Sequence, residues 1–185
     1  MDNGFAESEG MRNLKYLLGI DLGTSGTKTV LFEETGRSVA SETIEYPLYQ
    51  PKNGWAEQEP EDWWNAARDT VKAVIAKSGV KPEDVKGVGI SGQMHGLVLL
   101  DREGRVLRRS ILWCDGRTQE ECDEITQTIG KERLIELSAN PALTGFTAGK
   151  ILWVRKHEPE VYEKAAHILL PKDYVRYRLT GEYAA

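Results

Sequence analysis

The sequence predicts an α/β domain with a mixed β-sheet and flanking helices. Three short strand patterns follow one another near the N-terminus, a long amphipathic helix pattern comes next, and a buried strand pattern follows that helix. A strand, helix, strand order places the helix against one face of a sheet. At 185 residues and 40% hydrophobic content, the chain is long enough to bury one ordinary core.

The first three strands are separated by tight turns. Apolar residues predict a buried strand at 17–20, β-forming residues predict a second at 29–32, and an alternating pattern predicts a third at 38–46. Glycine-containing turns at 23–26 and 33–36 connect them as hairpins.

A long helix and several shorter elements follow. Pro60 is typical of an early helical position, and Ser78-Gly79 closes the helix pattern. Further helices are predicted at 118–129, 131–138, 147–157 and 171–179. Strands are predicted at 85–91, 97–100 and 168–170, and a strand or extended segment at 106–113.

The first turn carries groups suited to phosphate binding. Residues 17–29 read LLGIDLGTSGTKT, so Asp21 stands at the end of an apolar strand and a glycine-rich turn follows. Gly23 and Gly26 permit a sharp turn in which backbone N–H groups converge on an anion. Asp21 can hold a hydrated Mg²⁺ against bound phosphates. The predicted phosphate-binding residues are Gly23, Thr24, Ser25, Gly26, Thr27 and Lys28.

Two other nucleotide-binding motifs do not fit the sequence around residues 17–29. A Walker A loop opens a helix, whereas here strand-forming residues follow Lys28, and Thr27 alone separates it from Gly26. The dinucleotide fingerprint also fails, because Gly19 and Gly23 are too far apart. Strands joined by hairpins, with phosphate ligands in the first turn, resemble the ribonuclease H-like, actin-like ATPase fold. The alternative is a glycine-rich hairpin without a ligand.

A second loop carries groups suited to a sugar. Gln93, Met94 and His95 follow a buried strand and are flanked by Gly92 and Gly96. An amide, an apolar side chain and a neutral imidazole together offer donors and acceptors for hydroxyl groups and a surface for C–H faces. The alternative is a loop histidine satisfied by backbone groups. We expect the other two histidines to be surface or packing residues.

A third loop contains a charged pair. Asp115 and Arg117 follow the predicted 106–113 segment, where residues after a strand can reach a site. They can equally pair with each other as a structural contact. The sequence leaves both interpretations open.

Composition excludes several classes of partner. A net charge of -5, from 24 basic and 29 acidic residues, argues against nucleic acid or an anionic membrane. Cys114 and Cys122 lack a metal-ligand pattern, which favours free thiols in a reducing cytoplasm over a disulfide. No apolar run reaches the ~20 residues of a membrane span. Residues 1–13 are expected to be a disordered N-terminal extension, with Met11 as an alternative start.

Several motifs together resemble the FGGY family of carbohydrate kinases. They are GIDLGTSGTK, ISGQMHGLVLLD, ILWCDGRT, GFTAGKILWVRKHEPE and LLPKDYVRYRLTGEY, and residues 145–154 fit the family's first signature. The resemblance implies an ATP-dependent kinase with Mg²⁺, in which Asp21 lies near the metal and the phosphates and Gln93, Met94 and His95 bind the sugar. Glycerol kinases carry Arg-Glu at the positions of Met94 and His95, so a ketose is expected, with D-xylulose favoured.

The resemblance also implies a missing part. Family members have two actin-like domains, and the general-base aspartate and adenosine-binding glycines belong to the second. Residues 14–185 are therefore expected to be a first domain, truncated before the second and inactive alone. A non-catalytic sugar-binding fragment, half of a split kinase, and a kinase for another ketose or polyol remain alternatives. Besides sugar, ATP and the missing domain, association with a second copy of the chain stays open.

Overall fold

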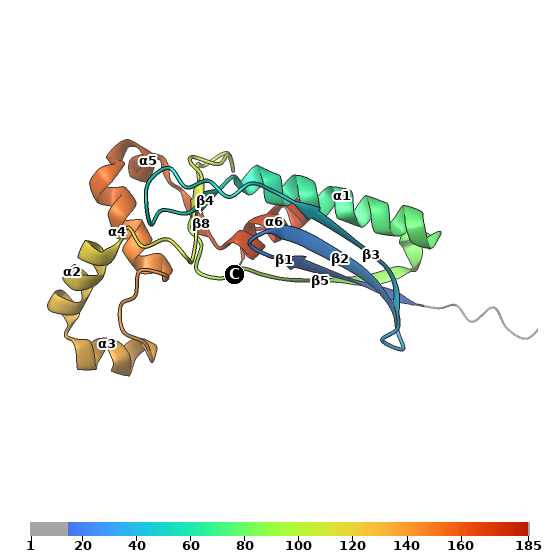
Figure 1. Ribbon diagram of the computed structural model, residues 1–185, viewed down its shortest axis with the longest axis horizontal. Coiled ribbons are helices and arrows are strands. Elements are labelled where there is room, and N and C mark those ends of the chain that lie inside the picture. Colours follow the sequence, from blue (N-terminus) through green and yellow to red (C-terminus); the bar gives the residue numbers. More distant parts are fainter. Residues whose placement is uncertain (1–14, 185) are drawn as a thin grey trace, which may run out of the picture.

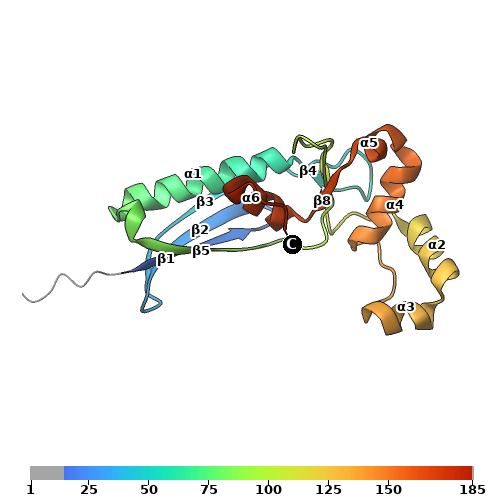
Figure 2. The ribbon, with the colours of Figure 1, turned by 180° about the vertical axis from the view of Figure 1, so that it is seen from behind.

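The molecule is elongated, with a sheet region at one end and a helical region at the other (Figure 1). The computed structural model describes residues 15–184, and the expected N-terminal extension at 1–13 lies outside the described residues. The sheet region is built from residues 16–45 and 60–92, and the helical region from residues 119–164. The view from behind shows the same separation (Figure 2).

The main sheet contains four strands: β1 (Tyr16–Leu22), β2 (Gly26–Glu33), β3 (Ser38–Glu45) and β5 (Val85–Gly92). Their order is β3, β2, β1, β5. The pairs β1–β2 and β2–β3 are antiparallel, whereas β1 and β5 are parallel. The sheet is therefore mixed, as predicted, because the hairpins give antiparallel neighbours and the helical crossover gives a parallel one.

Helix α1 (Pro60–Ser78) covers one face of this sheet (Figure 1). It begins at Pro60, and Gly79 ends it with a φ of 66°, the left-handed conformation that glycine adopts easily. Trp63, Ala67 and Val74 recur at helical spacing and are buried. The same face carries a hydroxyl pair, because Thr29 Oγ1 lies 2.7 Å from Thr70 Oγ1.

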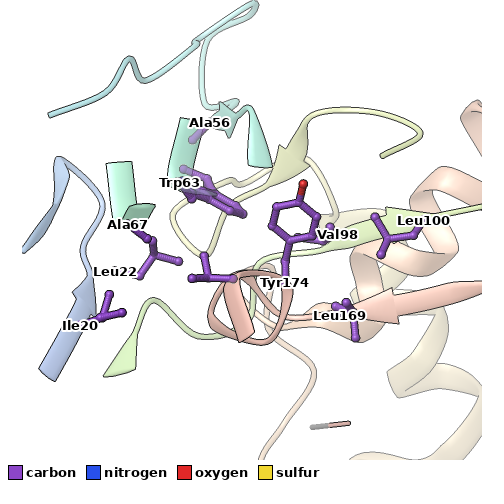
Figure 3. Close-up of a cluster of buried hydrophobic side chains, with 11 residues drawn as sticks. Ile20, Leu22, Ala56, Trp63, Ala67, Val98, Leu100, Leu169 and Tyr174 are labelled. Carbon is purple, nitrogen blue, oxygen red and sulfur yellow. The ribbon is translucent and has the colours of Figure 1, made fainter. Parts of the chain in front are cut away.

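One hydrophobic core joins the sheet, α1 and the C-terminal helix α6 (Pro171–Thr180). Figure 3 shows Leu22, Trp63, Ala67 and Tyr174 converging from three different elements. Trp63 and Tyr174 are the two largest of its fully buried side chains. Burying such aromatic surface is a dominant stabilising contribution to a core of this size.

Two small sheets link the two regions. β4 (Glu57–Gln58) pairs with β7 (Ser110–Ile111), and β6 (Val98–Leu100) pairs with β8 (His167–Leu169). The side chains along β6 alternate between two cores, as strand geometry requires. Val98 and Leu100 join the main core, whereas Leu99 packs in a second core with Trp153 of the helical region.

The helical region consists of α2 (Gln119–Ile129), α3 (Lys131–Ser138), α4 (Thr147–His157) and α5 (Pro159–Lys164). The four predicted helices after residue 117 agree with α2, α3, α4 and α6 to within one residue at each end. Of the predicted segment at 106–113, residues 110 and 111 alone form a strand. The sequence did not predict α5, β4 and the 3-10 turn Pro82–Asp84, because such short elements show no clear periodicity.

Candidate functional site

The predicted phosphate turn lies between β1 and β2, at the end of the sheet nearest the helical region (Figure 1). Side chains alternate along β1, so Leu22 enters the core while Asp21 is exposed. Asp21 is directly opposite Lys28 on β2 and Ser91 on β5. The strand register therefore gathers a carboxylate, an ammonium group and a hydroxyl in one row on the sheet face opposite α1.

The two glycines of this turn are required because other backbone atoms lie close to both positions. The Gly23 N–H donates to Gly26 O at 3.0 Å, so this amide closes the turn and does not stay free for an anion. A Cβ on Gly26 would lie 2.7 Å from Ile44 O. Neither glycine has a positive φ. The prediction of a tight glycine turn agrees with this geometry. Glycine is needed here because neighbouring backbone segments lie close together, not because of a positive φ.

Neutral side chains support the turn through hydrogen bonds. The Tyr46 hydroxyl donates to Gly23 O at 2.5 Å, and burial raises the pKa of Tyr46 to about 12, so it stays a donor at neutral pH. Gln58 Nε2 donates to Thr24 O at 2.7 Å. Trp113 Nε1 donates to Thr24 Oγ1 at 3.1 Å, which leaves the threonine hydroxyl hydrogen able to donate to a ligand.

The predicted sugar loop follows β5 and lies next to the turn. Gln93 is 9% exposed, and its Nε2 donates to Gly23 O at 3.3 Å and to Gln58 Oε1 at 3.0 Å. The amide nitrogen, expected to meet a sugar, instead ties the loop to the phosphate turn. Gln93 Oε1 is buried without a hydrogen-bond partner among residues 15–184. Met94 is 58% exposed, and His95 is half-buried.

The turn and the loop share one cavity of about 310 Å³. Asp21 and Thr24 line it from the turn, Met94 and His95 from the loop, and Trp113 from the segment after β7. Trp113 was not among the site residues predicted from the sequence. Its position at the end of the predicted 106–113 segment resembles that of the other site groups at strand ends, and this was the available signal.

The remaining predicted phosphate ligands lie elsewhere around the turn. Ser25 is exposed at its tip, and Lys28 lines a second cavity, of about 500 Å³, together with Asp21 on the open sheet face. Thr27 is fully buried, and its hydroxyl lies 3.4 Å from the Tyr46 hydroxyl. The alternation along β2 therefore directs the Thr27 side chain away from both cavities.

The charged pair after β7 is structural. Arg117 donates to both carboxylate oxygens of Asp115, at 2.9 and 2.7 Å, and Asp115 also accepts from the Ala56 N–H at 2.6 Å. Arg117 lies over the Trp55 ring, with its guanidinium carbon 3.6 Å from the ring centroid. A second carboxylate, Glu57, contacts Arg117 at 2.8 Å. Of the two interpretations, the structure selects pairing.

Comparison with known proteins assigns this arrangement to a family. Residues 16–185 match the N-terminal domain of the FGGY family of carbohydrate kinases. The chain belongs to this family. It is 48% identical over 168 residues to the xylulose kinase of Bacillus subtilis (strain 168), covering 91% of this chain and 34% of that protein. The chain thus spans about a third of the length of the curated relatives it matches.

Solved structures of this FGGY family confirm the predicted actin-like fold class. The crystal structure of a xyloylose kinase from Brucella ovis is 40% identical with a TM-score of 0.86, covering 91% of this chain and 35% of that chain. The gluconate kinase from Lactobacillus acidophilus is 30% identical with a TM-score of 0.84, covering 91% and 34%. Backbone similarity alone therefore does not separate these two sugar substrates.

The FGGY site has a donor set that fits Mg²⁺ bound together with phosphates. Within residues 15–184, the Asp21 carboxylate is exposed and has no hydrogen-bond or ion-pair partner. Mg²⁺ in nucleotide sites keeps several waters and takes one or two carboxylates. A cluster of three or more potential metal-ligating His, Cys, Asp or Glu residues is absent from the described part of the chain. None of the described helices is long and apolar enough to cross a membrane.

Proposed function

We propose that this chain is the N-terminal part of an ATP-dependent sugar kinase that converts D-xylulose to D-xylulose 5-phosphate. One observation carries the proposal: the Asp21 turn and the Met94–His95 loop line the same cavity. Phosphoryl transfer requires a hydroxyl group and a phosphate side by side, and this arrangement supplies a surface for each. The xylulose kinase relatives, 46–48% identical, support the choice of sugar.

The loop residues and Trp113 supply the sugar side of the site. The imidazole of His95 can donate to or accept from a ketose hydroxyl through its two nitrogens. Met94 and the half-exposed Trp113 ring offer apolar surface to the C–H faces of the sugar. These groups bind and orient the substrate, which is the main catalytic contribution expected in phosphoryl transfer.

The turn residues supply the phosphate side. When bound, Mg²⁺ neutralises the charge that develops on the transferred phosphoryl group. Asp21 would hold that ion, and the hydroxyls of Thr24 and Ser25 would donate to phosphate oxygens. Lys28 adds a positive charge on the open face of the sheet. Thr27 takes no part through its side chain, because that side chain is buried.

The chain alone is expected to show negligible turnover. Asp21 is the one carboxylate among the described residues lining the 310 Å³ cavity, and it is assigned to the metal. A general base typically contributes about 10²–10⁴ in rate. ADP release by the 185-residue chain with ATP, Mg²⁺ and D-xylulose should therefore stay at background. Turnover comparable with an ordinary kinase would contradict this expectation.

Calorimetric titration of the chain tests the sugar assignment. D-Xylulose should bind, and His95→Ala should weaken binding at least about tenfold through loss of the imidazole's hydrogen bonds. His157→Ala is the matched control, because His157 lies on α4 outside both cavities and stacks on Trp153. Absence of D-xylulose binding by the unmodified chain, with folding verified, would overturn the proposal.

The same titration separates the alternatives. D-Ribulose and D-gluconate binding as strongly as D-xylulose would contradict the substrate choice. Sugar binding without Mg²⁺-ATP binding would favour a non-catalytic sugar-binding unit. Turnover that appears when the chain is mixed with a separately produced second domain would favour half of a split kinase.

A further inference from the structure

Lys150 is a buried cation without an anionic partner. Its side chain, on α4, is fully buried, and among the described residues no carboxylate lies within 4 Å of its Nζ. The ammonium group donates to two backbone carbonyl oxygens instead, His95 O at 2.7 Å and Gly145 O at 2.5 Å. It therefore links α4 both to the sugar loop and to the segment that precedes the helix.

Burying the Lys150 ammonium group costs free energy, and an apolar side chain could pack at this position without that cost. Burial disfavours the charged form and lowers the pKa of Lys150 to about 8. A methionine of similar length would fill the same space without desolvating a charge. The two hydrogen bonds offset part of that penalty, because they satisfy the charged donor.

The carbonyl that Lys150 contacts belongs to a strained turn. His95 has a φ of 63°, a left-handed conformation that side-chain-bearing residues rarely adopt. The Gly96 N–H donates to Met94 O at 2.8 Å, which closes a tight three-residue turn around His95. Thr147 Oγ1 also donates to His95 O, at 3.2 Å. Two donors from the first turn of α4 thus converge on one strained residue.

The other sides of this turn are closely packed. A Cβ on Gly96 would lie 2.6 Å from Cγ of Pro171, so α6 presses on the turn from one side. The His95 ring packs on Phe146 with centroids 4.7 Å apart, and His95 lines both the 310 Å³ cavity and an apolar cavity of about 270 Å³. The backbone conformation of His95 and its contact with Phe146 together orient the imidazole.

We propose that Lys150 is a positioning residue, whose ammonium group holds the His95 backbone in its left-handed conformation and so presents Met94 and the imidazole to the sugar cavity. The inference rests on the proposed function for what the loop binds. The contact between Lys150 and the His95 backbone is independent of the proposed function and can be measured without sugar.

Local hydrogen exchange and histidine NMR test the inference on the 185-residue chain. In Lys150→Met, the Gly96 amide should exchange at least about tenfold faster than in the unmodified chain, and the His95 ring signals should shift. Amides in the middle of β5 and the ring signals of His157 should not change. Lys156→Met is the matched control, because Lys156 lies on the same helix, its side chain is 42% exposed, and it contacts the buried Glu121 and the exposed Glu124, not the sugar loop.

Two results would overturn the inference. One is unchanged exchange at Gly96 and unchanged His95 signals in Lys150→Met. The other is faster exchange spread equally over α4 and β5, which would show a general structural role. If Lys150→Met does not fold, Thr147→Val removes the weaker donor, and it should accelerate Gly96 exchange severalfold with the same local pattern.

A sugar titration of the same variants keeps the two proposals separable. Lys150→Met should raise the Kd for D-xylulose at least about tenfold, and Lys156→Met should leave it unchanged. If the unmodified chain binds no D-xylulose, the proposed function fails. The exchange and ring signals still decide the role of Lys150.

Discussion

The phosphate turn and the sugar loop are held in place by different means. The turn belongs to a regular antiparallel hairpin, and neutral donors from Tyr46, Gln58 and Trp113 support its carbonyl and hydroxyl oxygens. The sugar loop contains a left-handed His95, and a buried ammonium group from another region supports it. The turn therefore depends on the sheet region, and the loop depends on the helical region.

Different parts of the fold thus support the two walls of one cavity. Gln93 is the direct link between the two, because its amide nitrogen bonds to the turn while its backbone begins the loop. A change in α4 is therefore expected to affect the sugar-binding groups more than the phosphate turn, because Lys150 and Thr147 contact the loop. The variants below separate the two walls, beginning with the largest expected effect on stability.

Trp63→Ala should destabilise the chain most. Trp63 is fully buried in the main core, and its Nε1 donates to Gln58 Oε1 at 3.1 Å beneath the phosphate turn. Truncating a buried tryptophan typically costs about 3–5 kcal/mol in the free energy of unfolding. Urea denaturation measures the change. Trp64→Ala is the control, because Trp64 is only partly buried, and an equal loss in both variants would contradict this assignment.

The sequence predicted the sheet region more completely than the supports of the site. Hydrophobic periodicity and glycine placement gave the hairpin, α1 and the position of Asp21, because these are local properties of the chain. The roles of Gln58 and Gln93 came from contacts 34 and 70 residues apart in sequence. No local pattern encodes such pairs, so the sequence did not show that the Gln93 amide nitrogen bonds to the protein.

The conformation of the sugar loop also depends on residues that are distant in sequence. The glycines around His95 correctly indicated a break after β5, but the left-handed φ of His95 is imposed by Lys150, Thr147 and the packing of Pro171. In the sequence, Lys150 stood out only as part of the family signature at residues 145–154. Its contact with a backbone carbonyl 55 residues away required the fold.

Stability should rise with pH in a way that depends on Lys150. Its pKa is about 8 in the folded chain, against an ordinary value of 10.5. Between these values the folded state binds fewer protons than the unfolded state, so the free energy of unfolding increases with pH. The increase is at most about 1.4 kcal/mol per pH unit, or roughly 2–3 kcal/mol from pH 8 to 10.

Comparison with Lys150→Met isolates this contribution. Urea denaturation at several pH values gives the difference between the two proteins, which should grow from pH 8 to 10 in favour of the unmodified chain. The charged and titratable groups facing Lys150 are Asp115, Arg117, Cys114 and Cys122, and they are common to both proteins. A pH-independent difference would show that the ammonium group is not desolvated.

Gln93→Leu should mainly lower stability, and Met94→Ala should mainly lower the affinity for D-xylulose. Gln93→Leu removes two hydrogen bonds but leaves Gly23 O and Gln58 Oε1 with Tyr46 and Trp63 as donors, so we expect a loss of about 1–2 kcal/mol. Met94 is exposed, and Met94→Ala should change stability by less than about 0.5 kcal/mol. D-Xylulose affinity should fall more in Met94→Ala, and the reverse order would restore Gln93 as a direct ligand.

Asp21→Asn should have the smallest effect on stability and a large one on Mg²⁺-nucleotide binding. The carboxylate is exposed and lacks a partner among the described residues, so the free energy of unfolding should change by less than about 0.5 kcal/mol. The amide keeps the shape of the side chain but removes the charge that a hydrated Mg²⁺ requires. Titration with ATP in the presence of Mg²⁺ should therefore show a loss of affinity in Asp21→Asn and none in Glu34→Gln, a control in the exposed turn after β2. Equal nucleotide binding by the two variants would place the metal away from β1, and the phosphate wall of the cavity would need another carboxylate.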